Sequence, residues 1–236
     1  MRASPVNAAT RQGRRRFTIG HELGHFLMTH HKPPPGQPFQ CSREDMRRWT
    51  DKEKSAAIKM EVEANEFSSL ILMPPPLWRA RASKLGDPNL AQIVALAKDF
   101  QVSKEAAARA YAQYHEESIA IVVAKDGVIE KIYRKPAGFP TICVRSGDQV
   151  PKPSLLFRAV KQLNHPSEIG EAKAELWLES DRWRTLPPLY EQVFHQQDGY
   201  ALIMLWAEAQ QGDDEDPEED MTSKQRLARR QEQWRT

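Results

Sequence analysis

Two histidines and a glutamate near the start of the chain have a spacing that suits metal chemistry, in the run His21-Glu22-Leu23-Gly24-His25. In a helix, positions i and i+4 lie on one face one turn apart, so both imidazoles can reach one tetrahedral zinc ion. Glu22 points to the side of that face, where a carboxylate can take a proton from a zinc-bound water whose pKa is lowered to about 7. The motif therefore predicts a zinc peptidase site, with His21 and His25 as metal ligands and Glu22 as general base.

The motif must sit on a helix, which the pattern predicts from Phe17 to about His30, before the stop at residues 33–36 (Pro-Pro-Pro-Gly). Apolar residues cover most of this helix's circumference, which predicts a buried helix with one polar wedge. His21, Glu22 and His25 lie in that wedge. Buried imidazoles and a carboxylate need partners, and a metal ion would be one. The alternative is a pair of core histidines that are hydrogen-bonded without metal.

A catalytic zinc site needs a third protein ligand. A second helix is predicted from about Glu53 to Met73, where Pro74-Pro75-Pro76 follows. Glu63 falls inside its apolar stripe, whereas Glu61 points well away. An inward carboxylate is costly unless it is paired or binds metal, so we expect Glu63 to be the third ligand. The alternative is a buried salt bridge from Glu63 to an arginine of residues 14–16.

Three further residues bear on this choice. His31 has the offset of the third metzincin histidine, but Met28 stands where that motif has glycine. We therefore expect His30 and His31 to be solvent-facing or helix-end residues rather than ligands. Asn65 is a candidate for an outer hydrogen bond to a ligand or for helix packing.

Two linked motifs resemble the ImmA/IrrE metallopeptidase family. They are Phe-Thr-Ile-Gly-His-Glu-Leu-Gly-His (17–25) and Glu-Ala-Asn-Glu-Phe (63–67) with the later Leu-Met-Pro (72–74), and the similarity covers residues 6–115. The resemblance implies a gluzincin-like Zn²⁺ site of His21, His25 and Glu63 with Glu22 as base. It also implies a protein substrate, namely a transcriptional repressor of the helix-turn-helix kind. A supporting edge strand of this family is expected to be reduced to Pro5-Val6-Asn7.

The rest of the chain predicts an α+β protein with three parts. Residues 1–115 form a mainly helical, zincin-like domain, 116–210 a smaller α+β domain of unknown role, and 211–236 a disordered tail that is first acidic and then basic. The first part ends with helices over 90–100 and 104–115. The second begins with a β-hairpin, because alternating apolar residues flank Asp126-Gly127.

Further strands are predicted at Thr141–Val144, Ala174–Leu178 and Tyr200–Trp206, and the tryptophans at 177, 183 and 206 are expected in the core. The composition excludes other classes of protein. Net charge is +2, so no global field favours nucleic acid or a membrane surface. No apolar run has the length of a membrane span. Two cysteines cannot build a disulfide framework, which favours a reducing, cytoplasmic location.

Two other functions compete with the peptidase. Residues 90–114 resemble a helix-turn-helix, which would suit a DNA-binding regulator, although the second helix has few groups that read bases. A zinc-stabilised interaction protein without turnover is the other. The donor that would stabilise a transition state is not identifiable from the sequence, and Arg79, Tyr111 and His115 are the candidates. The oligomeric state is not predicted.

Overall fold

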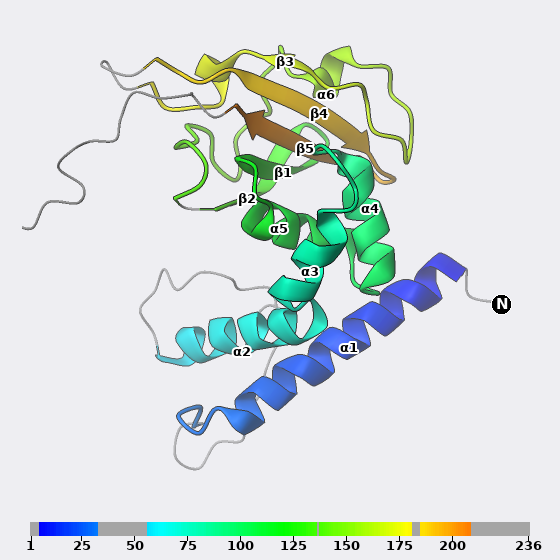
Figure 1. Cartoon of the computed structure of the whole chain (residues 1–236), viewed down its shortest axis with the longest axis vertical. Coiled ribbons are helices and arrows are strands. Elements are labelled where there is room, and N and C mark those ends of the chain that lie inside the picture. The colour runs from blue at the N-terminus through cyan, green and yellow to red at the C-terminus, as the bar shows by residue number, and fades with distance from the viewer. Residues whose placement is uncertain (1–4, 33–55, 136, 181–184, 209–236) are drawn as a thin grey trace, which may run out of the picture.

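The structure, a computed structural model, describes residues 5–32, 56–135, 137–180 and 185–208 (Figure 1). Its helices are α1 (Pro5–Leu27), α2 (Ala56–Leu72), α3 (Pro75–Ala82), α4 (Leu90–Asp99), α5 (Lys104–Tyr114), α6 (Leu155–Arg158) and the 3₁₀ helix η2 (Ala174–Leu176). Its strands are β1 (Ile119–Lys125), β2 (Val128–Arg134), β3 (Gly170–Ala172), β4 (Leu189–His195) and β5 (Tyr200–Ala207). These elements confirm a mixed α and β architecture, and the predicted charged tail and Trp183 lie outside the described residues.

The helices form two groups. The long α1 packs along α2 at one end of the molecule, and the short α3 leads from α2 to α4 and α5, which lie against the sheet (Figure 1). The triple proline ends α2 as predicted, but the next helix was missed. Pro75 and Pro76 occupy the first turn of α3, where the missing N–H costs no helix hydrogen bond.

All five strands are antiparallel, in the order β2-β1-β5-β4-β3. The hairpin around Asp126-Gly127 is confirmed: both residues have positive φ, 50° and 81°, as a type I′ turn requires. β1 lies between β2 and β5, and both of its faces are covered. Ile119, Ile121 and Val123 face the helices, whereas the residues between them face the loops on the other side of the sheet.

One hydrophobic core joins α3, α4 and α5 to this sheet. It includes Trp78, Ile93 and Tyr111 from the helices and Ile121 and Met204 from the strands. Packing therefore continues across residue 115, where the sequence places a domain boundary. That boundary stays a prediction.

In the second half of the chain, two predicted strands are wrong, and strand β4 was not predicted. Residues 174–176 form a 3₁₀ helix, and residues 141–144 contribute only the isolated bridge from Ile142 to Leu178. β4 was missed because its alternation is hidden by two buried polar residues, Glu191 and Gln192. Tyr200–Trp206 is confirmed as a strand, and Trp177 is buried as expected.

The first helix also differs from its prediction. It begins at Pro5, so residues 5–7 are helical and not an edge strand. Its apolar arc is not buried: Ile19 and Phe26 are 57% and 82% exposed, whereas His21 and His25 are buried. The reason is that α1 packs on α2 through small and polar residues, so His21 and His25 face inward, whereas Glu22 of the same predicted wedge is exposed.

Candidate metal centre

Small residues let the two helices approach closely. A side-chain carbon added at Gly20 would lie 2.6 Å from Ser68 Oγ, and one added at Gly24 would lie 3.2 Å from the Ala64 Cα atom. Ser68 Oγ also donates a hydrogen bond of 2.8 Å to the Phe17 carbonyl. The spacing of four residues places both glycines on one side of α1, next to the side that carries His21 and His25. This close contact between α1 and α2, which we call the seam, therefore brings the histidines directly against α2.

This contact predicts the effect of a larger residue. Gly20→Val places a branched side chain against Ser68, and overpacking of this kind is expected to destabilise the protein by about 2–3 kcal/mol. Denaturant unfolding of the metal-free protein measures this loss. Ile19→Val is the matched control, because residue 19 is 57% exposed and the change should stay within about 0.5 kcal/mol. Equal, small effects of both substitutions would show that the seam is not tightly packed.

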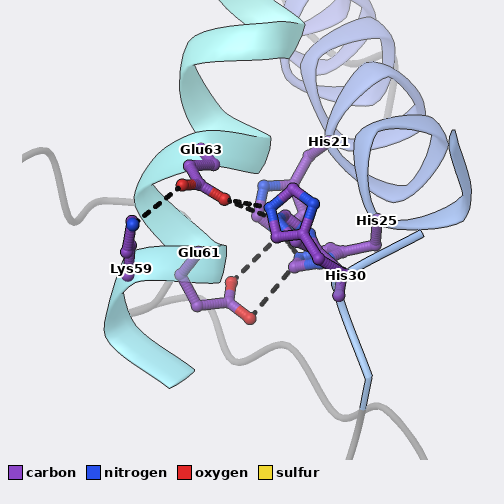
Figure 2. A network of polar contacts seen from close by, with 7 residues as sticks. His21, His25, His30, Lys59, Glu61 and Glu63 are labelled. Atoms are coloured by element: carbon purple, nitrogen blue, oxygen red, sulfur yellow. Dashed lines mark hydrogen bonds and ion pairs between the residues drawn. The ribbon is translucent and has the colours of Figure 1, made fainter. Parts of the chain in front are cut away.

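Three ligand atoms meet across the seam (Figure 2). His21 Nε2 lies 3.2 Å from His25 Nε2. The carboxylate of Glu61 reaches both rings, with 3.2 Å from Oε2 to His21 Nε2 and 3.4 Å from Oε1 to His25 Nε2. The side chains are 0%, 5% and 12% exposed for His21, His25 and Glu61. The two predicted histidine ligands are thus together, and a glutamate from α2 is beside them.

The distances fit a tetrahedral ion. Nitrogen and oxygen ligands about 2.0–2.1 Å from zinc lie about 3.3 Å from one another at the corners of a tetrahedron. The two ring nitrogens lie 3.2 Å apart, and each has a different oxygen of Glu61 near it, Oε2 at 3.2 Å from His21 and Oε1 at 3.4 Å from His25. A set of two imidazoles and one carboxylate is also a known zinc ligand set. The residues present therefore fit a zinc ion with one further position open.

The electrostatics favour a cation at this place. Burial, together with the neighbouring His25, lowers the pKa of His21, and burial followed by the neighbouring His31 lowers the pKa of His25. Both rings are therefore neutral near pH 7, which is the form that binds metal. A buried carboxylate beside two neutral rings is costly unless a positive charge compensates it.

A hydrogen bond sets the proton position on His21. Its Nδ1 lies 3.0 Å from Asn65 Oδ1, and both groups are buried. Because the amide oxygen accepts only, Nδ1 carries the proton and Nε2 directs its lone pair toward His25 and Glu61. The outer hydrogen bond considered for Asn65 is therefore present. Asn65 and Glu61 are themselves one helical turn apart on α2, so both reach the same site.

Glu22 is exposed, and it lies outside the set of three ligand atoms. Its negative charge raises the pKa of both His21 and His25, against the larger effect of burial. The carboxylate is therefore near both rings while it stays accessible to solvent. The role of Glu22 as general base stays a prediction.

Glu63 does not reach His21 or His25. Its Oε2 lies 2.9 Å from His31 Nε2 and 2.7 Å from His30 Nε2, and its Oε1 lies 3.8 Å from Lys59 Nζ (Figure 2). Hydrogen bonds from His30 and His31 lower the pKa of Glu63. The sequence analysis was wrong about Glu61, which it expected to point away from the site. It was also wrong about His31, which it expected to be solvent-facing or at a helix end, because the His31 side chain is 0% exposed.

Other candidates have different partners. Arg16, which was considered as a partner of Glu63, donates a 2.9 Å hydrogen bond to the Phe100 carbonyl. The Tyr111 hydroxyl donates to Gln92 Oε1 at 2.7 Å and accepts from the Asn89 backbone, within the helical core. His115 packs its ring against Tyr111, and Arg79 is exposed on α3. Among the described residues, His115 belongs to neither group of ligand atoms, and the role of a transition-state donor stays a prediction for all three.

The helix-turn-helix resemblance has a structural explanation. The helices α4 and α5 are present at the predicted positions, with Asn89 and Ser103 as N-caps. However, α5 is packed on the sheet, and its exposed residues are Glu105 and Gln113. Such a helix presents no basic face to a DNA groove.

Among the described residues, none of the helices has the length and hydropathy to cross a bilayer. No curated protein matches the chain significantly. Residues 6–111 match the family described as the IrrE N-terminal-like domain, which is a peptidase family. This match covers α1 through most of α5, and so includes both helices of the metal centre. It confirms the resemblance and indicates a metallopeptidase-type function. Residues 6–111 of this chain are therefore similar to the IrrE N-terminal-like domain of the ImmA/IrrE family.

Proposed function

We propose that the protein is a zinc-dependent endopeptidase whose metal ligands are His21, His25 and Glu61. The observation that carries this proposal is the convergence of three buried side chains: the two Nε2 atoms lie 3.2 Å apart, and the two oxygens of Glu61 lie 3.2 and 3.4 Å from them, which suits a tetrahedral zinc ion. Glu61 thereby replaces Glu63, which the sequence favoured. The similarity of residues 6–111 to a peptidase family supports the same class of reaction.

The residues divide the chemistry between them. When bound, zinc acts as a Lewis acid that activates water and polarises a peptide carbonyl. Glu22, exposed beside the ligands, takes the proton of the attacking water and passes it to the leaving amine. Asn65 holds the His21 ring so that its Nε2 faces the site.

We also propose the class of substrate, a regulatory protein such as a helix-turn-helix repressor. The support for this is the family resemblance of the two motifs. A repressor encoded next to this gene is the first candidate to test. Incubation of the two purified proteins, followed by mass spectrometry of the fragments, would show one or a few defined cuts. An intact repressor beside active cleavage of a peptide library would contradict the substrate and leave the peptidase standing.

Metal removal tests the reaction class. The purified protein is expected to contain about one zinc per chain, because one set of ligand atoms has the geometry described above. A chelator should abolish cleavage of a quenched fluorescent peptide library, and added zinc should restore it. His21→Ala should lose the metal and the cleavage together. Cleavage that survives complete metal removal would overturn the proposal, and bound zinc without cleavage would favour a zinc-stabilised interaction protein.

A further inference from the structure

A second group of side chains of metal-ligand type lies next to the first. His30, His31 and Glu63 place three ligand atoms near one another, with 2.7 and 2.9 Å between Glu63 Oε2 and the two Nε2 atoms. His31 is reached by a turn after α1, in which its N–H bonds to the Met28 carbonyl at 2.9 Å. This group has two possible uses. It is either a second metal site or a hydrogen-bonded support for the first.

The contact that decides between them joins the two groups. His25 Nδ1 and His31 Nδ1 lie 2.9 Å apart, and both side chains are buried. Two ring nitrogens at this distance share one proton, so one must donate and the other accept. The direction of this single hydrogen bond therefore fixes the proton positions on both rings.

The direction follows from the inner site. When the Nε2 atom of a neutral His25 ring binds metal, Nδ1 keeps the proton and donates it to His31 Nδ1. His31 then carries its own proton on Nε2, from which it donates to Glu63 Oε2 at 2.9 Å. A metal on His31 Nε2 would move that proton to Nδ1, where it would face the proton of His25. A neutral His31 therefore cannot serve both purposes.

We infer that His31 and Glu63 are positioning residues, which hold His25 through the hydrogen-bonded series His25–His31–Glu63, and that they do not form a second metal site. This inference rests on the proposed function, since it takes His25 as a ligand. It gives each ligand histidine an outer partner: Asn65 for His21, and His31 backed by Glu63 for His25. His30 touches the same oxygen of Glu63 but stands outside the series, with a side chain that is 64% exposed.

Zinc affinity and stoichiometry of the full chain test the inference, with a chromogenic chelator as competitor. Loss of an outer partner typically weakens metal binding about 10–100-fold, and we expect this for His31→Ala and Glu63→Ala. Because Glu63 acts through His31, the double variant should lose no more than His31→Ala alone. His31→Asn should recover most of the affinity, because its amide oxygen can take the place of Nδ1 as acceptor. His30→Ala is the control and should leave the affinity unchanged.

The outcomes separate the two uses. The visible spectrum of the cobalt-substituted protein reports the ligand geometry, and all of these variants should keep a tetrahedral spectrum. Two metal ions per chain, one of them lost in His30→Ala, would overturn the inference and leave the inner site standing. Unchanged zinc affinity in Glu63→Ala would also overturn it. The Glu63 side chain is 28% exposed, so we expect this variant to fold. A wild-type chain that binds no zinc would overturn the proposed function together with this inference.

Discussion

Glu22→Gln is expected to lower peptide cleavage by about 10²–10⁴-fold, the usual contribution of a general base. The amide has the size of the carboxylate but cannot accept the proton of the attacking water. Since Glu22 is exposed and is not among the three ligand atoms, the variant should still bind one zinc. Cleavage of a peptide library at saturating zinc, together with metal analysis of the same sample, measures both effects.

A matched substitution controls for the loss of one surface charge. Glu66 is an exposed glutamate on α2, so Glu66→Gln makes the same chemical change outside the ligand set. This control should keep nearly full activity. A Glu22→Gln variant as active as the control would show that the base is another group. A variant that loses its zinc would instead show that Glu22 belongs to the ligand set.

The parts of the site that the sequence predicted are those set by one helix. His21 and His25 depend only on the i, i+4 geometry of α1. The third ligand depends in addition on how α2 is rotated against α1. That rotation is a tertiary property, and the apolar stripe was a misleading guide to it.

The apolar stripe predicted the wrong third ligand because the buried side of each helix is not its apolar side. On α2 the buried positions include Ala64, Asn65 and Ser68, whereas Leu70 and Ile71 are 39% and 48% exposed. Close approach through Gly20 and the other small residues determines the seam instead. The signals for it are present in the sequence, as small residues four apart on both helices. They indicate a close helix contact only when the two helices are considered together.

The sheet shows the same contrast between local and tertiary information. The Asp126-Gly127 hairpin was predictable, because a two-residue turn with positive φ selects these residue types. β4 was not, because its buried Glu191 and Gln192 read as surface residues. In the structure Gln192 accepts from the Leu90 backbone N–H at 2.7 Å, and Glu191 accepts from that of Leu155 at 3.1 Å. These partners are distant in the chain, so no local pattern reveals them.

The two candidate third ligands make a decisive comparison. Glu61→Ala should lower zinc affinity by more than the roughly 10–100-fold typical of an outer residue, because it removes a ligand. The structure places its two oxygens 3.2 and 3.4 Å from the ligand nitrogens of α1. Glu63→Ala should stay within the outer-residue range, since its contacts are with His30 and His31.

Both substitutions remove one glutamate from the same helix, two positions apart, so charge and helix propensity are matched. Dialysis against a chelator of known affinity, followed by metal analysis, ranks the two variants directly. Retention of zinc by Glu61→Ala together with its loss from Glu63→Ala would make Glu63 the ligand, as the sequence favoured. This result would also contradict the hydrogen-bonded series His25–His31–Glu63, because Glu63 cannot both bind the metal and accept the proton of His31. The expected ranking is a much larger loss of zinc affinity in Glu61→Ala than in Glu63→Ala. It would support an inner site of His21, His25 and Glu61 with Glu63 behind it.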